Sequence, residues 1–397
     1  MANKFKIVLV VSRIVAPPVD GGAKYVYNIA KGLSNQGHEI TFVSFKSDIH
    51  PQSPEMIKDF ADIIYDENSF HPFGFIAFVK SLFLWKPISV IHRMNVKKMN
   101  NLLQKLHFTP DFFFLEGIHS ALMIDSIRSG FPKSKIILRQ ANTEYELLSK
   151  RAARNRNPLM KLFFKWQSAI MYRYEARCFR QADGVTGISN YDLNNYQKMY
   201  PDGKYLTVPM PMDVKIYHRN STNQFRILLI SDWSWHPNLN GLVWFLDNVV
   251  PKVINKKNEL LFEIVGKGLD DEFIEKHKHS GINFHGFVDD LTHFFQNCDI
   301  FAAPLLYGGG IKIKVVEALS NSMPVITTTQ GIEGLSVDIN KDLVVADTAD
   351  DFAEQIINLS CNPELRNSLS LNALKWASTN NDETQIISRL TSFLSGL

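Results

Sequence analysis

Cysteine is scarce in this chain of 397 residues, which has three, Cys178, Cys298 and Cys361. They are odd in number, far apart in the sequence and without the spacing of a metal-binding motif. The sequence therefore predicts neither a disulfide framework nor a zinc site. A chain so poor in cysteine fits a reducing compartment, and we expect the protein to be cytoplasmic.

Long apolar runs are also missing. No segment reaches the roughly 18 uninterrupted apolar residues that are needed to span a bilayer. The nearest is PFGFIAFVKSLFLW, residues 72–85, which is short and contains Lys80. It fits either an apolar element packed in the protein or an amphipathic element that touches a membrane surface or an apolar acceptor.

Charge of one sign is not in excess. Lysine and arginine number 43 and acidic residues 40, for a formal net charge of +3, which does not indicate a nucleic-acid-binding protein. Hydrophobic residues make up 45% and charged residues 21%, which indicates large cores and excludes a disordered chain. At this length one core usually stops growing, so we expect two domains.

Strand-like apolar runs alternate with helical patterns in both halves, which is typical of parallel sheets with crossover helices. The expected strands are residues 6–12, 39–46, 111–117, 135–141, 184–189, 225–231, 260–266, 282–286, 299–304, 324–328 and 342–347.

A stretch rich in Pro, Asn and Ser, residues 208–223, interrupts this alternation and indicates a linker. We therefore predict an α/β protein of two Rossmann-like, doubly wound domains. They cover residues 1–208 and 209–376, and a C-terminal helix over about 377–397 is expected to pack back on the first domain.

The stretch YGGGIKIKVVEAL, residues 307–319, places lysine where a helix is expected to begin. Cations are unfavourable there, because a helix start carries partial positive charge. A bound anion would reverse the sign: glycines allow close backbone approach, N–H groups cradle phosphate oxygens, and the ammonium groups of Lys312 and Lys314 neutralise the rest. Solvated lysines beside an ordinary glycine turn are the alternative.

Glu317 follows Lys314 by three residues and so lies on the same helix face. A carboxylate there can accept hydrogen bonds from two sugar hydroxyls, such as those of a ribose. A dinucleotide site is the competing prediction, but it needs a G-x-G-x-x-G fingerprint after the first strand. The loop at that point reads PPVDGGAK, so the fingerprint is not met.

Residues 304–335 strongly resemble the donor-binding signature of family-four glycosyltransferases (glycosyl transferases group 1), in the variant with a GGG loop and an EGL end. The resemblance implies the GT-B fold, with two Rossmann-like domains facing across a cleft. It implies transfer with retention from a nucleotide diphosphate sugar, with no metal and no other cofactor. The donor-binding residues implied here are Gly308, Gly309, Gly310, Ile311, Lys312, Lys314 and Glu317.

Two departures from the family pattern affect the chemistry. Gly309 stands where many members carry the first glutamate of a two-glutamate motif, so backbone N–H groups of the glycine loop are expected to contact the sugar instead. The loop SDWSWHPNLNG, residues 231–241, has no arginine or lysine for the diphosphate. Lys312 and Lys314 are left for that task, and we expect Lys314 to be catalytic. Asn238 fits either the PN motif of a subgroup or a simple helix cap.

The likeness extends over most of the chain. It implies donor contacts for Gly21 and Gly22 after the first strand, and for Gly266, Phe287 and Val288 in the second half. His119 matches a histidine that lies near the transferred sugar, and we expect it to be catalytic. The resemblance also implies positions on the acceptor side or the sugar side, which are Glu116, Arg139, Asn142 and Glu144. Glu116 is alternatively a partner of His119. The last three belong to the segment LRQANTEYE, in which Ala141 replaces the usual histidine.

Basic residues recur among aromatic ones from Arg151 to Arg180, with Glu175 as the one acid. Such a helix fits either an anionic membrane surface or a solvated face over a core stripe. The expected partners are a nucleotide-sugar donor, a glycan, lipid-linked or other small acceptor, and a membrane surface, but no nucleic acid. Location at the inner face of the membrane would follow.

The resulting prediction is a retaining glycosyltransferase in the synthesis of a cell-surface polysaccharide or glycoconjugate. Two alternatives stay open. One is a nucleotide-sugar-binding protein without transfer activity, which Gly309 favours. The other is a GT-B epimerase that acts on the nucleotide sugar itself.

Overall fold

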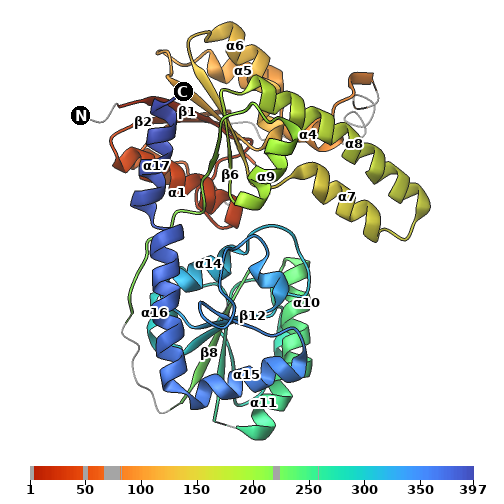
Figure 1. Cartoon of the computed structure of the whole chain (residues 1–397), viewed down its shortest axis with the longest axis vertical. Helices are drawn as coiled ribbons and strands as arrows, with labels where there is room; N and C mark the ends of the chain where they lie inside the picture. Colours follow the sequence, from red (N-terminus) through yellow and green to blue (C-terminus); the bar gives the residue numbers. More distant parts are fainter. Residues whose placement is uncertain (1–3, 48–51, 67–80, 82, 218–223, 258) are drawn as a thin grey trace. The chain divides into compact units, whose positions relative to one another are not determined.

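The computed structural model divides into two compact units (Figure 1). Unit 1 comprises Met1–Pro211 and Glu383–Leu397, and unit 2 comprises Met212–Asp382. The structure describes residues 4–47, 52–66, 81, 83–217, 224–257 and 259–397. The boundaries between the units follow Pro211 and Asp382, whereas the sequence predicted boundaries after residues 208 and 376.

Unit 1 contains a parallel sheet in the order β3-β2-β1-β4-β5-β6-β7. Strand order reverses at β1, which pairs with β2 on one side and with β4 on the other. The short strands β3 and β7 form the two edges and were not predicted from the sequence. The strands are β1 Lys6–Val10, β2 Glu39–Phe45, β3 Asp62–Asp66, β4 Phe112–Glu116, β5 Lys135–Gln140, β6 Gly184–Gly187 and β7 Tyr205–Thr207.

Helices cover both faces of this sheet (Figure 1). Alternate side chains such as Val8, Phe113 and Leu138 pack into a core with helices α4 to α6, α8 and α9. On the opposite face α1 packs beside the C-terminal helix α17. Bounds are α1 Gly21–Asn35, α2 Glu55–Lys58, α4 Ile88–Arg93, α5 Val96–Leu103, η1 Ile118–Met123, α6 Ile124–Gly130, α7 Glu144–Arg154, α8 Pro158–Gln181, α9 Asn190–Met199 and α17 Glu383–Ser395.

Unit 2 repeats the plan with a parallel sheet in the order β10-β9-β8-β11-β12-β13. Strand order reverses at β8, which lies between β9 and β11. The strands are β8 Arg226–Ile230, β9 Leu261–Val265, β10 Ile282–Phe284, β11 Ile300–Ala303, β12 Val325–Thr327 and β13 Val344–Val345.

One face of the second sheet, with Ile227, Phe262 and Ile326, forms the core of unit 2. Around it lie α10 His236–Trp244, η2 Phe245–Val249, α11 Val250–Lys256, α12 Asp271–Lys276, α13 Thr292–Asn297, α14 Ile313–Ser320, η3 Thr329–Ile332, α15 Ala349–Cys361 and α16 Pro363–Asn380. The predicted fold class, two doubly wound α/β halves, is confirmed.

Among the described residues, no helix combines the length and apolar character that crossing a membrane requires. Of the apolar run 72–85, residues 72–80 and 82 lie outside the described residues.

Candidate functional site

The glycine loop of unit 2 follows β11 at the point where strand order reverses. Ligands of doubly wound sheets bind at such points, beyond the carboxyl ends of the strands. Gly308 has φ +131° and Gly310 φ +73°, backbone conformations that residues with a Cβ rarely adopt. Helix α14 begins at Ile313, and its N-cap residue Lys312 makes no side-chain cap. The structure thus has the predicted strand, glycine loop and helix start.

Lys314 points back toward the loop after β8. Its Nζ donates to Ser231 Oγ at 2.6 Å and to Asn238 Oδ1 at 2.9 Å. The same ammonium lies 5.8 Å from the centre of the Trp233 ring. Asn238 in turn donates through Nδ2 to the carbonyl of Asp232 at 2.8 Å, which fixes the direction of its amide oxygen. Lys314 therefore links α14 to the strand next to β11.

Burial and, to a smaller extent, the nearby charge of Lys312 together lower the pKa of Lys314 to about 7. Ser231 and Asn238 offer oxygen dipoles but no full negative charge. An anion bound beside this ammonium would favour its charged form. The site can therefore accept negative charge with a preplaced donor.

Lys312 lies in a different environment from Lys314. Its Nζ donates to the Gly310 carbonyl at 2.5 Å and lies 3.5 Å from Glu333 Oε2. Gln330 donates to the Gly308 carbonyl at 2.8 Å and to Glu333 at 2.7 Å. Lys312, Gln330 and Glu333 thus hold the glycine loop in place from the side of η3.

The remaining predicted residues of this loop vary in exposure. Gly309, at the position of the family's first glutamate, is exposed, while Ile311 and Glu317 are half-buried. Glu317 lies on α14, three residues after Lys314. The structure therefore places Lys314 in the first turn of α14, directly after the glycine loop, and Glu317 one turn further along the same helix.

Gly266 comes directly after β9 and packs against the same edge. It has φ +133°, and an added Cβ would lie 1.7 Å from the Ser231 carbonyl oxygen. Its N–H donates to the Gly286 carbonyl at 2.6 Å, which joins it to the segment after β10. In that segment Phe287 is exposed and Val288 is half-buried. All the predicted donor residues of unit 2 therefore follow the carboxyl ends of β9, β10 and β11.

In unit 1, Glu116 and Arg139 form a buried ion pair. Arg139 donates through Nη1 to Glu116 Oε1 at 2.6 Å, and the two side chains are 1% and 7% exposed. The guanidinium also lies 4.8 Å from the Tyr25 ring centre. Burial alone would lower the pKa of Arg139, but Glu116 and Tyr25 act together against burial and raise that pKa. The carboxylate of Glu116 faces Arg139, which is its register partner on the neighbouring strand β5.

His119 lies in η1, directly after β4. Its Nε2 is buried and has no hydrogen-bond partner among the described residues. Burial lowers the pKa of His119 to about 3, with a further contribution from Arg93. Arg93 also acts on Glu144, whose pKa burial raises. His119 is therefore a neutral imidazole, and Asn142 and Glu144, both half-buried, begin the next loop and helix along the sheet edge.

Gly21 and Gly22 open α1, whose N-terminus already has a carboxylate. Asp20 accepts from the Ala23 N–H at 3.0 Å and pairs with Arg13. This arrangement differs from α14, whose N-cap residue is a lysine.

Sequence reasoning missed three residues of the unit 2 site and left a fourth open. Ser231, Gln330 and Glu333 were not predicted, and Asn238 was left between a family motif and a helix cap. The structure makes Asn238 a partner of Lys314, while α10 begins without a side-chain cap. Ser231 is the first residue after β8, and its place at the carboxyl end of a predicted strand was the one feature of the sequence that could have indicated it.

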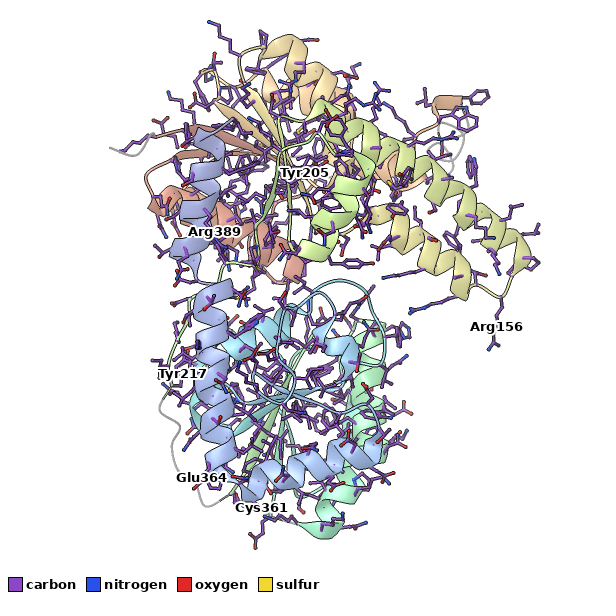
Figure 2. The ribbon with its side chains drawn as sticks, in the orientation of Figure 1. Arg156, Tyr205, Tyr217, Cys361, Glu364 and Arg389 are labelled. Atoms are coloured by element: carbon purple, nitrogen blue, oxygen red, sulfur yellow. The ribbon has the colours of Figure 1, made fainter. Side chains whose placement is uncertain are left out.

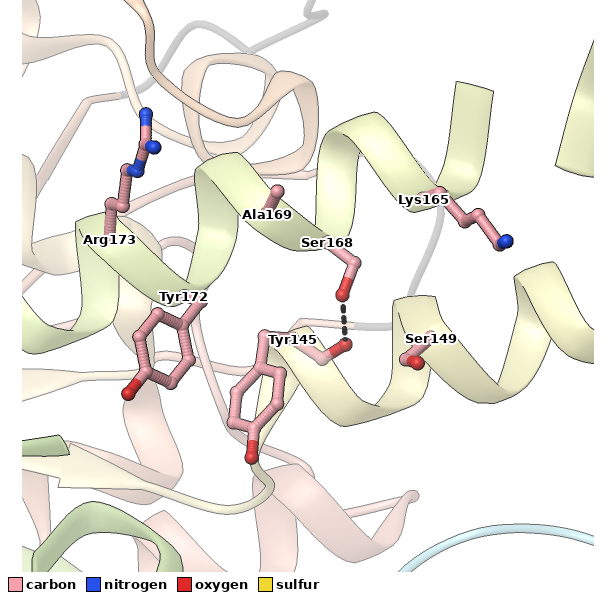
Figure 3. Close-up of a pocket in the computed structure, with 7 residues that line it drawn as sticks. All are labelled: Tyr145, Ser149, Lys165, Ser168, Ala169, Tyr172 and Arg173. Carbon is pink, nitrogen blue, oxygen red and sulfur yellow. Dashed lines mark hydrogen bonds between the residues drawn. The ribbon is translucent and has the colours of Figure 1, made fainter. Parts of the chain in front are cut away.

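A hollow of about 400 Å³ lies between α7 and α8 in unit 1 (Figure 3). The rings of Tyr145 and Tyr172 meet edge to face at 5.1 Å, and Ser168 donates to the Tyr145 carbonyl at 2.8 Å. Lys165 and Arg173 stand at opposite ends of the hollow and point apart (Figure 3). Their charges do not converge on one ligand, so this hollow does not compete with the site in unit 2.

Among the residues that the structure describes, no group of three or more His, Cys, Asp or Glu side chains is placed to hold a metal ion.

Known proteins resemble this chain in the sequence of unit 2 and in the fold. Residues 224–362, which lie in unit 2, match the family described as "Glycosyl transferases group 1". Sucrose-phosphate synthase from Thermosynechococcus elongatus superposes with a TM-score of 0.70 at 14% identity, over 99% of each chain. HepE from Anabaena, solved in complex with UDP-glucose, superposes with a TM-score of 0.63 at 14% identity, over 99% of this chain and 100% of its own.

The fold is GT-B. An "uncharacterized 44.6 kDa protein in cps region" from Klebsiella pneumoniae is 23% identical over 97% of this chain and 98% of its own length. The matched residues 224–362 include the glycine loop, Lys314 and Glu317.

Proposed function

We propose that the protein is a glycosyltransferase that moves a sugar from a nucleotide diphosphate sugar to an acceptor. The observation that carries this proposal is the ammonium of Lys314, held by Ser231 and Asn238 at the start of α14 where the strand order of unit 2 reverses. The match of residues 224–362 to group 1 glycosyltransferases supports it. The UDP-glucose in the HepE complex supports the donor class.

In this proposal the diphosphate lies against the glycine loop and the first turn of α14. Lys314 neutralises the charge that develops on the leaving diphosphate, and Glu317 accepts hydrogen bonds from the ribose. Gly266, Phe287 and Val288 contact the nucleobase. Because these cations and N–H groups supply the positive charge, we propose that transfer needs no metal.

Transfer with retention is part of the proposal and rests on the family resemblance. Gly309 has no side chain to offer the sugar, so N–H groups of the glycine loop take that place. From unit 1, His119 contributes a neutral imidazole to the transferred sugar. Asn142 and Glu144 belong to the acceptor side, as do the buried pair Glu116 and Arg139 beneath it.

The acceptor is proposed to be a glycan or a lipid-linked sugar in the synthesis of a cell-surface polysaccharide. The cps region named for the Klebsiella pneumoniae relative supports this assignment. The corresponding location is the cytoplasm, at the inner face of the membrane.

A thermal-shift screen of UDP-, GDP- and dTDP-sugars tests the donor, because a ligand that binds the folded state raises the melting temperature. The selected donor is then incubated with and without candidate acceptors while release of the nucleoside diphosphate is measured. A transferase releases it only with acceptor. Binding without release at any acceptor indicates a nucleotide-sugar-binding protein, and conversion of the donor alone indicates an epimerase.

A further inference from the structure

We propose that the α7–α8 hairpin of unit 1 docks the protein on an anionic membrane surface, with the start of α8 inserted among the lipids. This inference does not depend on the transferase reaction. It rests on exposed apolar side chains, on the charge of one helix face and on the local structure that fixes both.

Apolar side chains are exposed where α8 begins. Leu159 is 77% exposed and Leu162 66%, and Met160 between them is also exposed. Leu159 and Leu162 are three residues apart and share one helix face, which Phe163 and Trp166 continue with ring centres 6.0 Å apart. Exposed apolar groups of this size, gathered in one place, indicate contact with a partner or a membrane.

This exposure is fixed by the way in which the helix starts. Asn157 caps α8 by accepting from the N–H groups of Leu159 and Met160 at 2.9 and 3.3 Å, and Pro158 occupies the first turn. Arg156, in the connection between the two helices, lies at the far end of the hairpin from the sheet of unit 1 (Figure 2). The apolar residues therefore stand at the tip of a projecting element.

A second apolar group is attached to the same helix. Phe83 is 80% exposed and Trp85 64%. Their segment is tied to α8 at Gln167, which accepts from the Ile88 N–H at 2.9 Å and donates to Ser81 Oγ at 3.3 Å. The indole of Trp85, an apolar ring with one N–H donor, is of the kind that is favoured at membrane interfaces.

The charge of α8 suits an anionic surface. Glu175, its one acid, is fully buried and accepts from Gln140 and from the first N–H groups of α7. The outward face of this helix, described from end to end, therefore has one sign of charge. Its exposed charged residues are Lys161, Lys165, Arg173, Arg177 and Arg180, and Arg154 and Arg156 extend the series around the tip.

A bilayer with anionic lipids fits these features better than an acidic protein does. Cations distributed along the exposed side of a long helix, beside apolar side chains at its end, match the boundary between charged headgroups and acyl chains. An acidic protein partner would need cations that converge on its acidic groups. At the hollow between α7 and α8 the two cations, Lys165 and Arg173, point apart (Figure 3).

The test is co-sedimentation of the whole protein with vesicles of phosphatidylcholine, with and without phosphatidylglycerol. We expect binding to the anionic vesicles and its loss at high salt. Arg154→Gln, Arg156→Gln and Lys161→Gln combined should weaken binding about a hundredfold, since each basic residue near such a surface contributes about fivefold. Leu159→Ser with Leu162→Ser should weaken it at least tenfold.

Matched controls come from unit 2. Leu371, in α16, is 68% exposed, so Leu371→Ser removes a comparable apolar side chain elsewhere. Lys256→Gln, Lys276→Gln and Lys278→Gln remove three exposed charges from that unit. The controls should bind as the parent does. The proposal would be overturned if the protein bound neither vesicle type, if it bound both equally, or if hairpin and control variants lost binding equally. Thermal melting of each variant checks its fold.

Discussion

At the scale of single residues, the two lysines of the glycine loop have separate roles. Lys314 faces Ser231 and Asn238, while Lys312 is held by Gly310 and Glu333. We expect Lys314→Ala to weaken donor binding about 10- to 100-fold, because a hydrogen bond to a charged group contributes about 1.5–3 kcal/mol. Isothermal titration with the donor found by thermal shift measures the loss.

The control for this substitution is Lys341→Ala. Lys341 is exposed and pairs with Asp338 at 2.9 Å, in a loop of the same unit. Its removal should leave the donor affinity unchanged. If Lys314→Ala and Lys341→Ala bind donor equally well, Lys314 does not contact the diphosphate.

The lowered pKa of Lys314 predicts a pH dependence of donor binding. The free protein loses this proton as the pH rises through about 7, whereas a bound diphosphate keeps the ammonium charged. Affinity should be level below that pH and fall above it, by up to about tenfold per pH unit, with uptake of a proton on binding. Titrations in buffers of different ionisation enthalpy measure the uptake, which Lys314→Met should abolish.

The same group predicts a trend in stability. An unfolded lysine keeps its proton up to a pH of about 10.4, whereas folded Lys314 loses it near 7. Between these values the unfolded state binds the extra proton, so the free energy of unfolding of unit 2 should rise with pH. In Lys314→Met the slope of the free energy of unfolding against pH should be smaller, by the amount that corresponds to about one bound proton. An identical slope in parent and variant would contradict the lowered pKa.

At the scale of elements, helix α7 depends on a carboxyl group from its neighbour. Glu175 of α8 accepts from the N–H groups of Glu144 and Tyr145, which are the first two residues of α7, and Thr143 makes no side-chain cap. Burial raises the pKa of Glu175 to about 8. Glu175→Ala leaves these donors unpaired and should destabilise unit 1 by about 2–4 kcal/mol.

Denaturant unfolding followed by circular dichroism measures this loss. Lys165→Ala, at an exposed position of α8, is the control and should cost less than about 0.5 kcal/mol. Comparable losses would show that the N-terminus of α7 is satisfied in another way.

Gly266 links the strand ends of unit 2. Because an added Cβ would lie 1.7 Å from the Ser231 carbonyl oxygen, Gly266→Ala must move the segment that holds Lys314. We expect a loss of more than 2 kcal/mol in stability and weaker donor binding. Gly286→Ala is the control: its φ of +63° is also positive, but a Cβ there meets nothing within 4 Å. It should cost only about 1 kcal/mol.

Sequence patterns predicted the strands and helices that contain a clear apolar run, because such a run shows locally that the element is buried. The strands around KIVLV and IFAA, the helix after the glycine loop and the fold class all follow from them. The half-buried edge strand β3, DIIYD, was missed because its pattern is weaker. The partners of Lys314 were missed because Ser231 and Asn238 lie 83 and 76 positions away along the chain. Only the packing of β8 beside β11 brings them together.

At the scale of the whole molecule, the chain ends in the unit in which it began. Helix α17 packs on α1, where Gly32 leaves room for Ile387, and it buries Ile386, Leu390 and Leu394. Each buried side chain of this size contributes about 1.5–3 kcal/mol. Unit 1 therefore needs residues that follow unit 2 in the sequence, whereas unit 2 is formed by one continuous segment.

This arrangement predicts how a truncated chain unfolds. Deletion of residues 383–397 uncovers α1 and should lower the unfolding temperature of unit 1, or unfold it, while unit 2 keeps its own transition. Differential scanning calorimetry with and without the nucleoside diphosphate part of the donor distinguishes the two transitions, because the proposed contacts of this part all lie in unit 2 and raise the transition of that unit. Truncation and Leu390→Ala should act on the transition that the nucleoside diphosphate does not shift, with Leu390→Ala costing about 2–5 kcal/mol. If truncation instead abolishes the donor-dependent transition, α17 stabilises both units, and the division of the chain at Asp382 does not describe its folding.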